Sequence, residues 1–173
     1  PKMRMERRRT EQAHLCIGLP GLSATHPDRY TLDLLNTVLG GGMSSRLFLE
    51  VRENRGLAYD IQSSVSHYLD SGALVVSAGV DPKRAVHAIE TILAEIAHMR
   101  DPVPEQELRK AKELIKGRLL LRMEDSSAVS AWLGVQEQLI GEIKEVPNVI
   151  SKIDSITVDD VKSVADKLLI EEK

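Results

Sequence analysis

Residues 40–59 constrain the fold more than any other segment of the chain, because glycines mark the boundaries between its helices and a strand. Three of these glycines end one helical pattern and a fourth ends the next: Gly40, Gly41, Gly42 and Gly56. Beyond the fourth glycine the apolar residues alternate, which predicts a strand. Ser44 and Ser45 can cap the second helix at its start. The segment therefore predicts a tight corner between a helix and a strand, with Gly56 in a left-handed or otherwise glycine-favoured conformation.

Two side chains flank this corner and form the candidate functional pair. Arg52 is expected in the last helical turn and Tyr59 near the start of the strand. Both donate hydrogen bonds, and the carbonyl groups of an extended peptide accept them, so the pair suits the gripping of a peptide backbone. A structural role is the alternative, because a cation complements the helix dipole and a tyrosine can pack at the core edge. A further arginine, Arg46, is expected to pair with Glu50 on its own helix.

The order of these pieces resembles the second half of the insulinase/pitrilysin-family zinc metallopeptidases, which include the mitochondrial processing peptidases. The family pattern there is a glycine cluster, Ser-Ser-Arg-Leu, an arginine, and Gly-Leu-x-Tyr before a strand. In this chain the same pieces are residues 40–42, 44–47, Arg52 and 56–59. Further matching pieces are residues 70–72, 107–108, Lys112 and 156–161. The resemblance therefore covers nearly the whole chain, and the common order and spacing make it specific.

The resemblance implies that the chain is the C-terminal half of such a peptidase, the half without zinc. In the family, the residues that match Arg52 and Tyr59 hydrogen-bond carbonyl groups of the bound peptide near the scissile bond. The implied partners are an extended peptide substrate and the N-terminal zinc-bearing half, located in the same protein or in a partner subunit. Zinc would belong to that other half, and proteolysis is expected only of the full-length enzyme.

The histidines of the chain fit a half that holds no metal. The family's zinc motif is His-x-x-Glu-His on a helix, where two imidazoles hold the metal and a carboxylate takes a proton from its bound water. The chain has five histidines, and the nearest approach to the motif, His87 with Glu90, is followed by Thr91. We therefore expect neither a metal site nor peptide cleavage in this chain alone. His67 is expected to be a partly buried histidine with satisfied ring nitrogens.

Hydrophobic periodicity along the chain predicts an α+β fold, with an antiparallel sheet packed against several helices. The expected elements are a strand over 12–19, helices over 27–40 and 45–55, paired strands over 59–69 and 73–80, and helices to the end. The helix after Asp81 is expected to turn one apolar face inward, formed by Val86, Ile89, Leu93 and Ile96. The last helix is expected to start with a capping box of Thr157 and Asp160.

The chain length of 173 residues fits a single domain, residues 1–173. In the resembled family another strand follows the last helix, so the resemblance implies that the chain is truncated just before it. An uncovered sheet edge would favour pairing with another chain, which keeps a homodimer open as a partner.

Composition narrows the partners and the location. The net charge of −3 gives no general attraction to nucleic acid or to an anionic membrane, and neither is expected as a partner. A single cysteine, Cys16, excludes a disulfide within the chain. The expected location is cytoplasmic, or mitochondrial in a eukaryote.

The sequence is compatible with three interpretations of function. The first is the zinc-free half of a peptidase that clamps its substrate. The second is a structural, non-proteolytic subunit of the same fold, and the third is a free-standing module that binds a peptide at its sheet edge. The presence of both Arg52 and Tyr59 at the family spacing favours the first, because a structural subunit needs neither.

Overall fold

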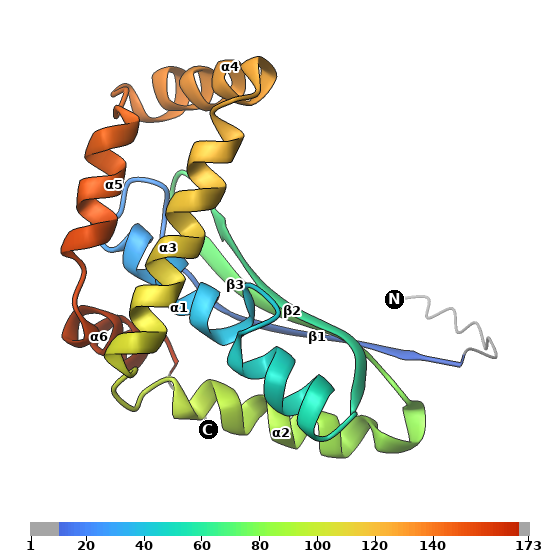
Figure 1. Cartoon of the computed structure of the whole chain (residues 1–173). Coiled ribbons are helices and arrows are strands. Elements are labelled where there is room, and N and C mark those ends of the chain that lie inside the picture. Colours follow the sequence, from blue (N-terminus) through green and yellow to red (C-terminus); the bar gives the residue numbers. More distant parts are fainter. Residues whose placement is uncertain (1–10, 170–173) are drawn as a thin grey trace.

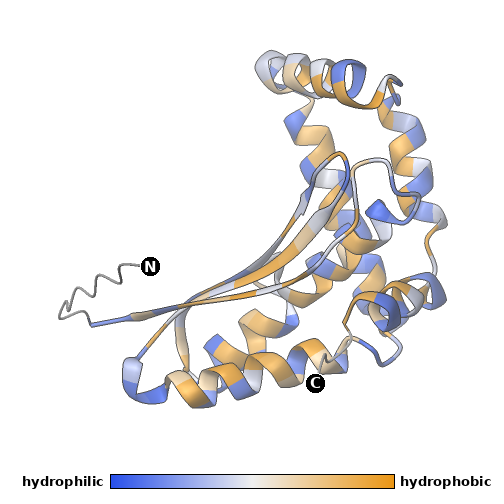
Figure 2. Ribbon diagram, turned by 180° about the vertical axis from the view of Figure 1, so that it is seen from behind, coloured by the Kyte–Doolittle hydropathy of each residue, from blue (hydrophilic) through white to orange (hydrophobic). Residues whose placement is uncertain are grey.

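The computed structural model describes residues 11–169, which form a three-stranded antiparallel sheet and a set of helices (Figure 1). The strands are β1 (Ala13–Pro20), β2 (Ala58–His67) and β3 (Gly72–Val80), and β3 lies in the centre, in the order β1-β3-β2. Both neighbours of β3 run antiparallel to it. The predicted α+β class is confirmed. The helices cover one face of the sheet, and Figure 2 shows the sheet from its other side.

The order of helices and strands along the chain is the one that periodicity predicts. Their bounds are α1 (Arg29–Gly40), the π-helix η1 (Phe48–Asn54), the 3-10 turn η2 (Pro82–Arg84), α2 (Ala85–His98), α3 (Glu105–Arg122), α4 (Ser126–Val135), the π-helical turn η3 (Gln136–Ile140), α5 (Val146–Ser155) and α6 (Val158–Leu168). The capping box predicted at Thr157 is present: its hydroxyl accepts from the Asp160 N–H, and the Asp160 carboxylate accepts from the Thr157 N–H.

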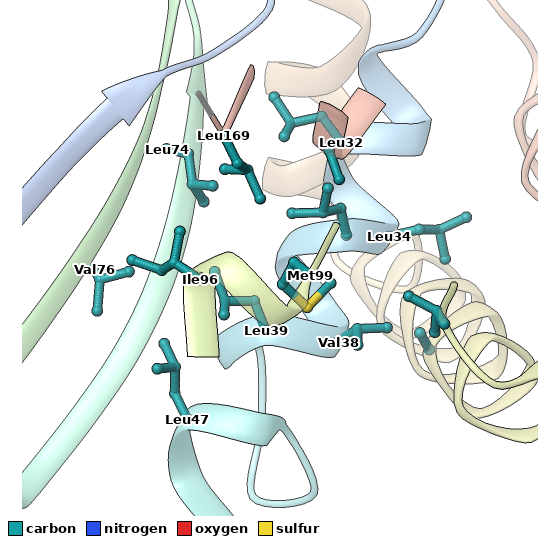
Figure 3. Packing of buried hydrophobic residues seen from close by; sticks show 14 of the residues in the cluster. Leu32, Leu34, Val38, Leu39, Leu47, Leu74, Val76, Ile96, Met99 and Leu169 are labelled. Carbon is teal, nitrogen blue, oxygen red and sulfur yellow. The ribbon is translucent and has the colours of Figure 1, made fainter. Parts of the chain in front are cut away.

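Helix α1 is the centre of the core, because it packs against β2 on one side and against α3 and α6 on the other. Apolar residues nearly all round it are therefore buried, as expected of a helix with no solvent-facing stripe. Figure 3 shows Leu39 on the side of this helix that faces the β3 residues Leu74 and Val76, and Leu34 and Val38 on its other side. Each such leucine stabilises the fold by about 2 kcal/mol through its removal from water.

The apolar face predicted for α2 is wrong in part. Val86 is 72% exposed and Leu93 is 49% exposed, whereas Ala88, Ile92 and Ile96 are buried. Helix α2 carries two overlapping apolar stripes, and only its neighbours select the buried one. Thr91, which the sequence places on the polar face, is also buried. Its burial is tolerated because the hydroxyl donates to the His87 carbonyl oxygen at 2.8 Å.

The start of β2 also differs from simple alternation. Ala58 lies opposite Val80 and Asp60 lies opposite Gly79, so Tyr59 is an extra residue, a β-bulge. Alternation would place Tyr59 on the inward face with Ile61. The bulge instead turns it outward, and its side chain is 58% exposed while Ile61 is buried.

Candidate functional site

The corner between η1 and β2 is built from backbone hydrogen bonds and one glycine. The Gly56 N–H donates to the Arg52 carbonyl at 3.1 Å, and the Leu57 N–H donates to the Val51 carbonyl at 2.8 Å. Gly56 has a φ of +58°, a left-handed value, which confirms the prediction of a glycine-favoured conformation here. Val51 and Leu57 are buried and anchor the two sides of the corner in the core. The chain therefore reverses tightly here, with residues 52–56 exposed between two buried residues.

Arg52 lies in the last turn of η1, where the sequence places it, with its side chain 41% exposed. Its guanidinium carbon lies 4.9 Å from the ring centroid of Phe48, one turn earlier, and its Nε lies 3.8 Å from Oε1 of Glu53. The ring contact supports the guanidinium from one side without using its N–H groups. Since a guanidinium has five such donors, most of them stay free for another partner.

Tyr59 lies on the other side of the corner, at the start of β2. Within the described residues, no hydrogen bond joins Tyr59 to Arg52. The two side chains are exposed to solvent, each on its own element. The elements themselves pack together, because η1 contacts β2. The pair therefore offers two surface donors on adjacent elements, a guanidinium and a phenol.

Arg46 has a different environment from the one expected. Its Nε donates to Oε1 of Glu107 at 3.0 Å and its Nη2 donates to Oε2 at 2.8 Å, a bidentate ion pair with α3. Its Nη1 also donates to the carbonyl oxygen of His98, at 3.2 Å. The hydrogen bond to Glu107 raises the pKa of Arg46. The predicted pairing with Glu50 is therefore wrong, since the guanidinium reaches a better-matched carboxylate across the fold.

Glu50 is occupied by other neighbours on η1. Its carboxylate accepts from Asn54 Nδ2 at 2.9 Å and from Arg55 Nε at 2.6 Å. These two hydrogen bonds lower the pKa of Glu50. Arg55 is thus held by its own helix in an exposed pair.

The three consecutive glycines allow close approach of the backbone. A Cβ on Gly40 would lie 2.7 Å from the backbone nitrogen of Ser63 in β2, and one on Gly41 would lie 2.6 Å from the Thr37 Cα. Gly42 has more room, with the nearest atom at 3.4 Å. Arg118 of α3, a residue that the sequence did not single out, donates to the Gly41 carbonyl at 2.8 Å. The glycines bring the end of α1 against β2.

Ser45 does not cap η1 as expected. Its hydroxyl donates to the carbonyl oxygen of Gly42, instead of accepting from a free N–H at the helix start. Its own carbonyl accepts the Leu49 N–H at 3.0 Å and so begins the helical hydrogen bonding. The serine stabilises the turn that precedes the helix.

His67, at the far end of β2, has both ring nitrogens satisfied, as predicted. Nδ1 lies 2.6 Å from the Leu22 carbonyl oxygen and Nε2 lies 3.2 Å from Oδ1 of Asp33. Both partners accept hydrogen bonds, so the doubly protonated ring fits the site best. The hydrogen bond to Asp33 raises the pKa of His67.

Residues 11–169 contain no cluster of three histidine, cysteine, aspartate or glutamate side chains able to hold a metal ion. His87 lies 3.7 Å from Glu90, but both are exposed on α2 and no third ligand joins them. Within the same range, no helix is both long enough and apolar enough to cross a membrane.

Comparisons with known proteins agree with this arrangement. The family model of the peptidase M16 inactive domain matches residues 1–115. An uncharacterised zinc protease of Bacillus subtilis is 39% identical over 167 residues, which cover 96% of this chain and 41% of the relative. An uncharacterised zinc protease of Streptomyces coelicolor is 40% identical over 163 residues, which cover 94% of this chain and 36% of the relative. The chain thus spans about two fifths of the length of the curated relatives it matches.

Solved structures extend the likeness to the fold. The peptidase M16 inactive domain from Pseudomonas fluorescens matches with a TM-score of 0.83 at 22% identity, over 91% of this chain and 38% of that chain. A chain of Complex III2 from Candida albicans also matches with a TM-score of 0.83 at 22% identity, over 96% and 42%. The resemblance seen in the sequence is confirmed, and the chain belongs to the peptidase M16 inactive domain family.

Proposed function

We propose that residues 1–173 form one domain, the zinc-free half of a zinc metalloendopeptidase, which closes over the peptide substrate and binds it through Arg52 and Tyr59. The observation that carries the proposal is the corner itself: two exposed hydrogen-bond donors on adjacent elements that a tight, hydrogen-bonded turn joins. The names of the relatives, zinc proteases more than twice as long as this chain, support a partner half that supplies the catalytic metal.

The proposed chemistry of the pair is positioning and electrostatic stabilisation. A guanidinium and a phenol can each donate to a peptide carbonyl oxygen, which fixes the peptide's register in the site. A donor aimed at the scissile carbonyl gains strength as negative charge develops on that oxygen. Zinc does not fit the described residues of this chain, because they offer no ligand cluster, so its place is the N-terminal half of the protein or a partner subunit.

A second candidate is a structural, non-proteolytic role. It is favoured by the likeness in fold to a chain of Complex III2, which suggests that this architecture can serve as one subunit of a larger assembly. A structural subunit has no need of free donors at the corner, so the two candidates differ in what Arg52 and Tyr59 are expected to do.

The test uses the full-length protein that contains this chain. Arg52→Ala and Tyr59→Phe should each lower kcat/KM for peptide hydrolysis, with zinc content and folding unchanged. Loss of a donor to the developing oxyanion typically costs about 10²–10³-fold, and loss of a ground-state contact costs less.

Matched controls separate this effect from a general surface change. Arg55→Ala removes an exposed arginine that directly follows the same helix, and Tyr68→Phe removes a hydroxyl from a tyrosine that is 59% exposed, close to the value for Tyr59. Arg46 is unsuitable as a control because it is bound to Glu107. Equal hydrolysis by all four variants would leave the structural role as the better interpretation.

A further inference from the structure

Arg84 reaches from the start of α2 to the corner between η1 and β2. Its Nη1 donates to the carbonyl oxygen of Gly56 at 3.0 Å, and its Nη2 donates to the carbonyl oxygen of Arg55 at 3.1 Å. The planar guanidinium presents its N–H groups as a fixed fork, which suits two acceptors that lie side by side. One side chain thus binds two consecutive carbonyl groups of the corner, from 28 and 29 residues further along the chain.

These two carbonyl groups directly follow η1, which ends at Asn54. The carbonyl groups at the end of a helix lack partners within the helix and carry the negative end of its dipole. A cation is therefore favoured at this position. Arg84 supplies this cation from a separate element and satisfies both oxygens at once.

The place of Arg84 in its own helix does not explain the residue type. Arg84 is the N-cap of α2, and within the described chain its side chain caps no N–H group of that helix. A positive charge at a helix N-terminus opposes the helix dipole, and serine, threonine, aspartate or asparagine are preferred as the cap. The gain from this arginine therefore lies at the corner, not in α2.

Two peptide groups transmit the contact to the backbone of η1. The peptide group between Arg55 and Gly56 accepts from Arg84, and its N–H donates to the Arg52 carbonyl at 3.1 Å. The next peptide group also accepts from Arg84, and its N–H donates to the Val51 carbonyl at 2.8 Å. Hydrogen bonds at the two ends of one peptide group strengthen each other. The guanidinium therefore reinforces the turn that holds Arg52.

The same guanidinium lies close along the chain to the partner strand of Tyr59. Ala58 lies opposite Val80, the last residue of β3, and η2 follows that residue and ends at Arg84. Tyr59 is the bulge residue next to Ala58. Helix α2 contacts η1, as Figure 1 shows. The connection between β3 and α2 is therefore joined to both sides of the corner.

We infer that Arg84 is a positioning residue, which fixes the corner so that Arg52 and Tyr59 are held in place for the peptide substrate. The inference rests on the proposed function of that pair. Both arms of the Arg84 guanidinium are occupied by carbonyl groups of the corner, so its effect on the substrate passes through the pair.

The first experiment measures amide hydrogen exchange, residue by residue, in the full-length protein without substrate. Arg84→Ala should speed the exchange of the Gly56 and Leu57 amides about tenfold, because both N–H groups belong to the released peptide groups. Exchange at Val76, in the centre of the sheet, should not change. Unchanged exchange at the corner would overturn the inference. So would an equal increase at Val76, because Arg84 would then support the fold as a whole.

The second experiment is a double-mutant cycle that measures kcat/KM for peptide hydrolysis by the full-length protein. Arg84→Ala alone should lower kcat/KM about tenfold. In a protein that already carries Arg52→Ala, the same substitution should change it less than about twofold. A merely structural residue would cause the same loss in both backgrounds, and that result would overturn the inference.

The matched control is Lys83→Ala, which removes a cation from the same 3-10 turn. Its kcat/KM should stay within about twofold of the unmodified protein. A loss as large as that of Arg84→Ala would mean that the charge of the turn matters and the hydrogen bonds do not, which would also overturn the inference. Thermal unfolding of Arg84→Ala checks that the fold is retained.

The two proposals can fail separately. If Arg52→Ala lowers hydrolysis while Arg84→Ala does not, the positioning role is wrong and the clamping pair stands. If Arg52→Ala and Tyr59→Phe both leave hydrolysis unchanged, both proposals are wrong, whatever the exchange rates at the corner.

Discussion

Arg46 and Arg52 lie in the same short segment but differ in exposure and in their hydrogen-bond partners. Arg46, 18% exposed, is bound to both carboxylate oxygens of Glu107 and to the His98 carbonyl, so it joins its own segment to α2 and α3. Arg52 is 41% exposed, and its neighbours among residues 11–169 are the Phe48 ring and the Glu53 carboxylate, 3.8 Å from its Nε. We refer to the first region as the anchor and to the second, with Gly56 and Tyr59, as the corner.

The contrast teaches that neighbouring residues of one motif divide between two tasks. A guanidinium with every direction filled by acceptors of the same fold contributes to stability and cannot take a new ligand. A guanidinium supported on one face, with its N–H groups at the surface, contributes little to stability and stays available. The anchor and the corner therefore predict opposite consequences for the same substitution.

The largest expected effect is on the anchor. Arg46→Ala should lower the free energy of unfolding by about 2 kcal/mol, because it leaves Glu107 and a carbonyl without their donor in a partly buried site. Arg52→Ala should change it by less than about 0.5 kcal/mol. Urea unfolding of both variants measures the difference, and comparable losses of stability would remove the distinction between the two regions.

The next effect lies at the corner. Gly56→Val should lower stability by about 1–2 kcal/mol, because a branched side chain is strained at a φ of +58°. No steric clash contributes, since a Cβ at this position meets nothing within 4 Å. Gly134→Ala is the control: it places a better helix former in α4, where the same measurement should show unchanged or higher stability. A fully stable Gly56→Val would mean that the corner can adopt another turn.

The smallest effect concerns the far end of β2, where His67 acts as a second anchor. Its pKa in the folded chain is raised above the ordinary value of about 6.5, chiefly by the hydrogen bond to Asp33. The stabilising contribution is therefore complete below about pH 6.5 and is lost as the pH rises through the raised pKa.

Comparison with His67→Gln isolates this contribution. The stability of the unmodified chain should fall relative to the variant when the pH increases from about 6 to 8. Chemical unfolding of both proteins across this range gives the difference. A difference that is constant with pH would show that the ring stays in one protonation state throughout.

Much of the fold could be predicted because its signals are local. The capping box at Thr157, the left-handed glycine at Gly56 and the order of helices and strands depend on residues within a few positions of one another. The buried face of α2 could not be predicted, since two apolar stripes compete and a threonine can be buried once its hydroxyl bonds within the helix.

The candidate site, too, could be predicted only in part from the sequence. Arg52 and Tyr59 stand out in the sequence by their type and their spacing around a glycine. Their exposure, however, could not be predicted from the sequence. Tyr59 is exposed because a bulge against β3 displaces it from the inward face, and the strand opposite lies well beyond it in the chain. A surface groove lined by residues 60–65 of β2 could not be predicted either, because its other walls come from α1 and α3.

The sequence by itself determined the class of the fold, its corner and the family, since periodicity, glycine conformation and motif order are properties of nearby residues. Only the tertiary structure decided which arginine is an anchor and which is free. That choice depends on which carboxylate lies within reach, and Arg46 finds Glu107 on a helix 61 residues further along the chain. Hydrogen bonds and ion pairs act over a few ångströms in space, whatever the distance along the sequence.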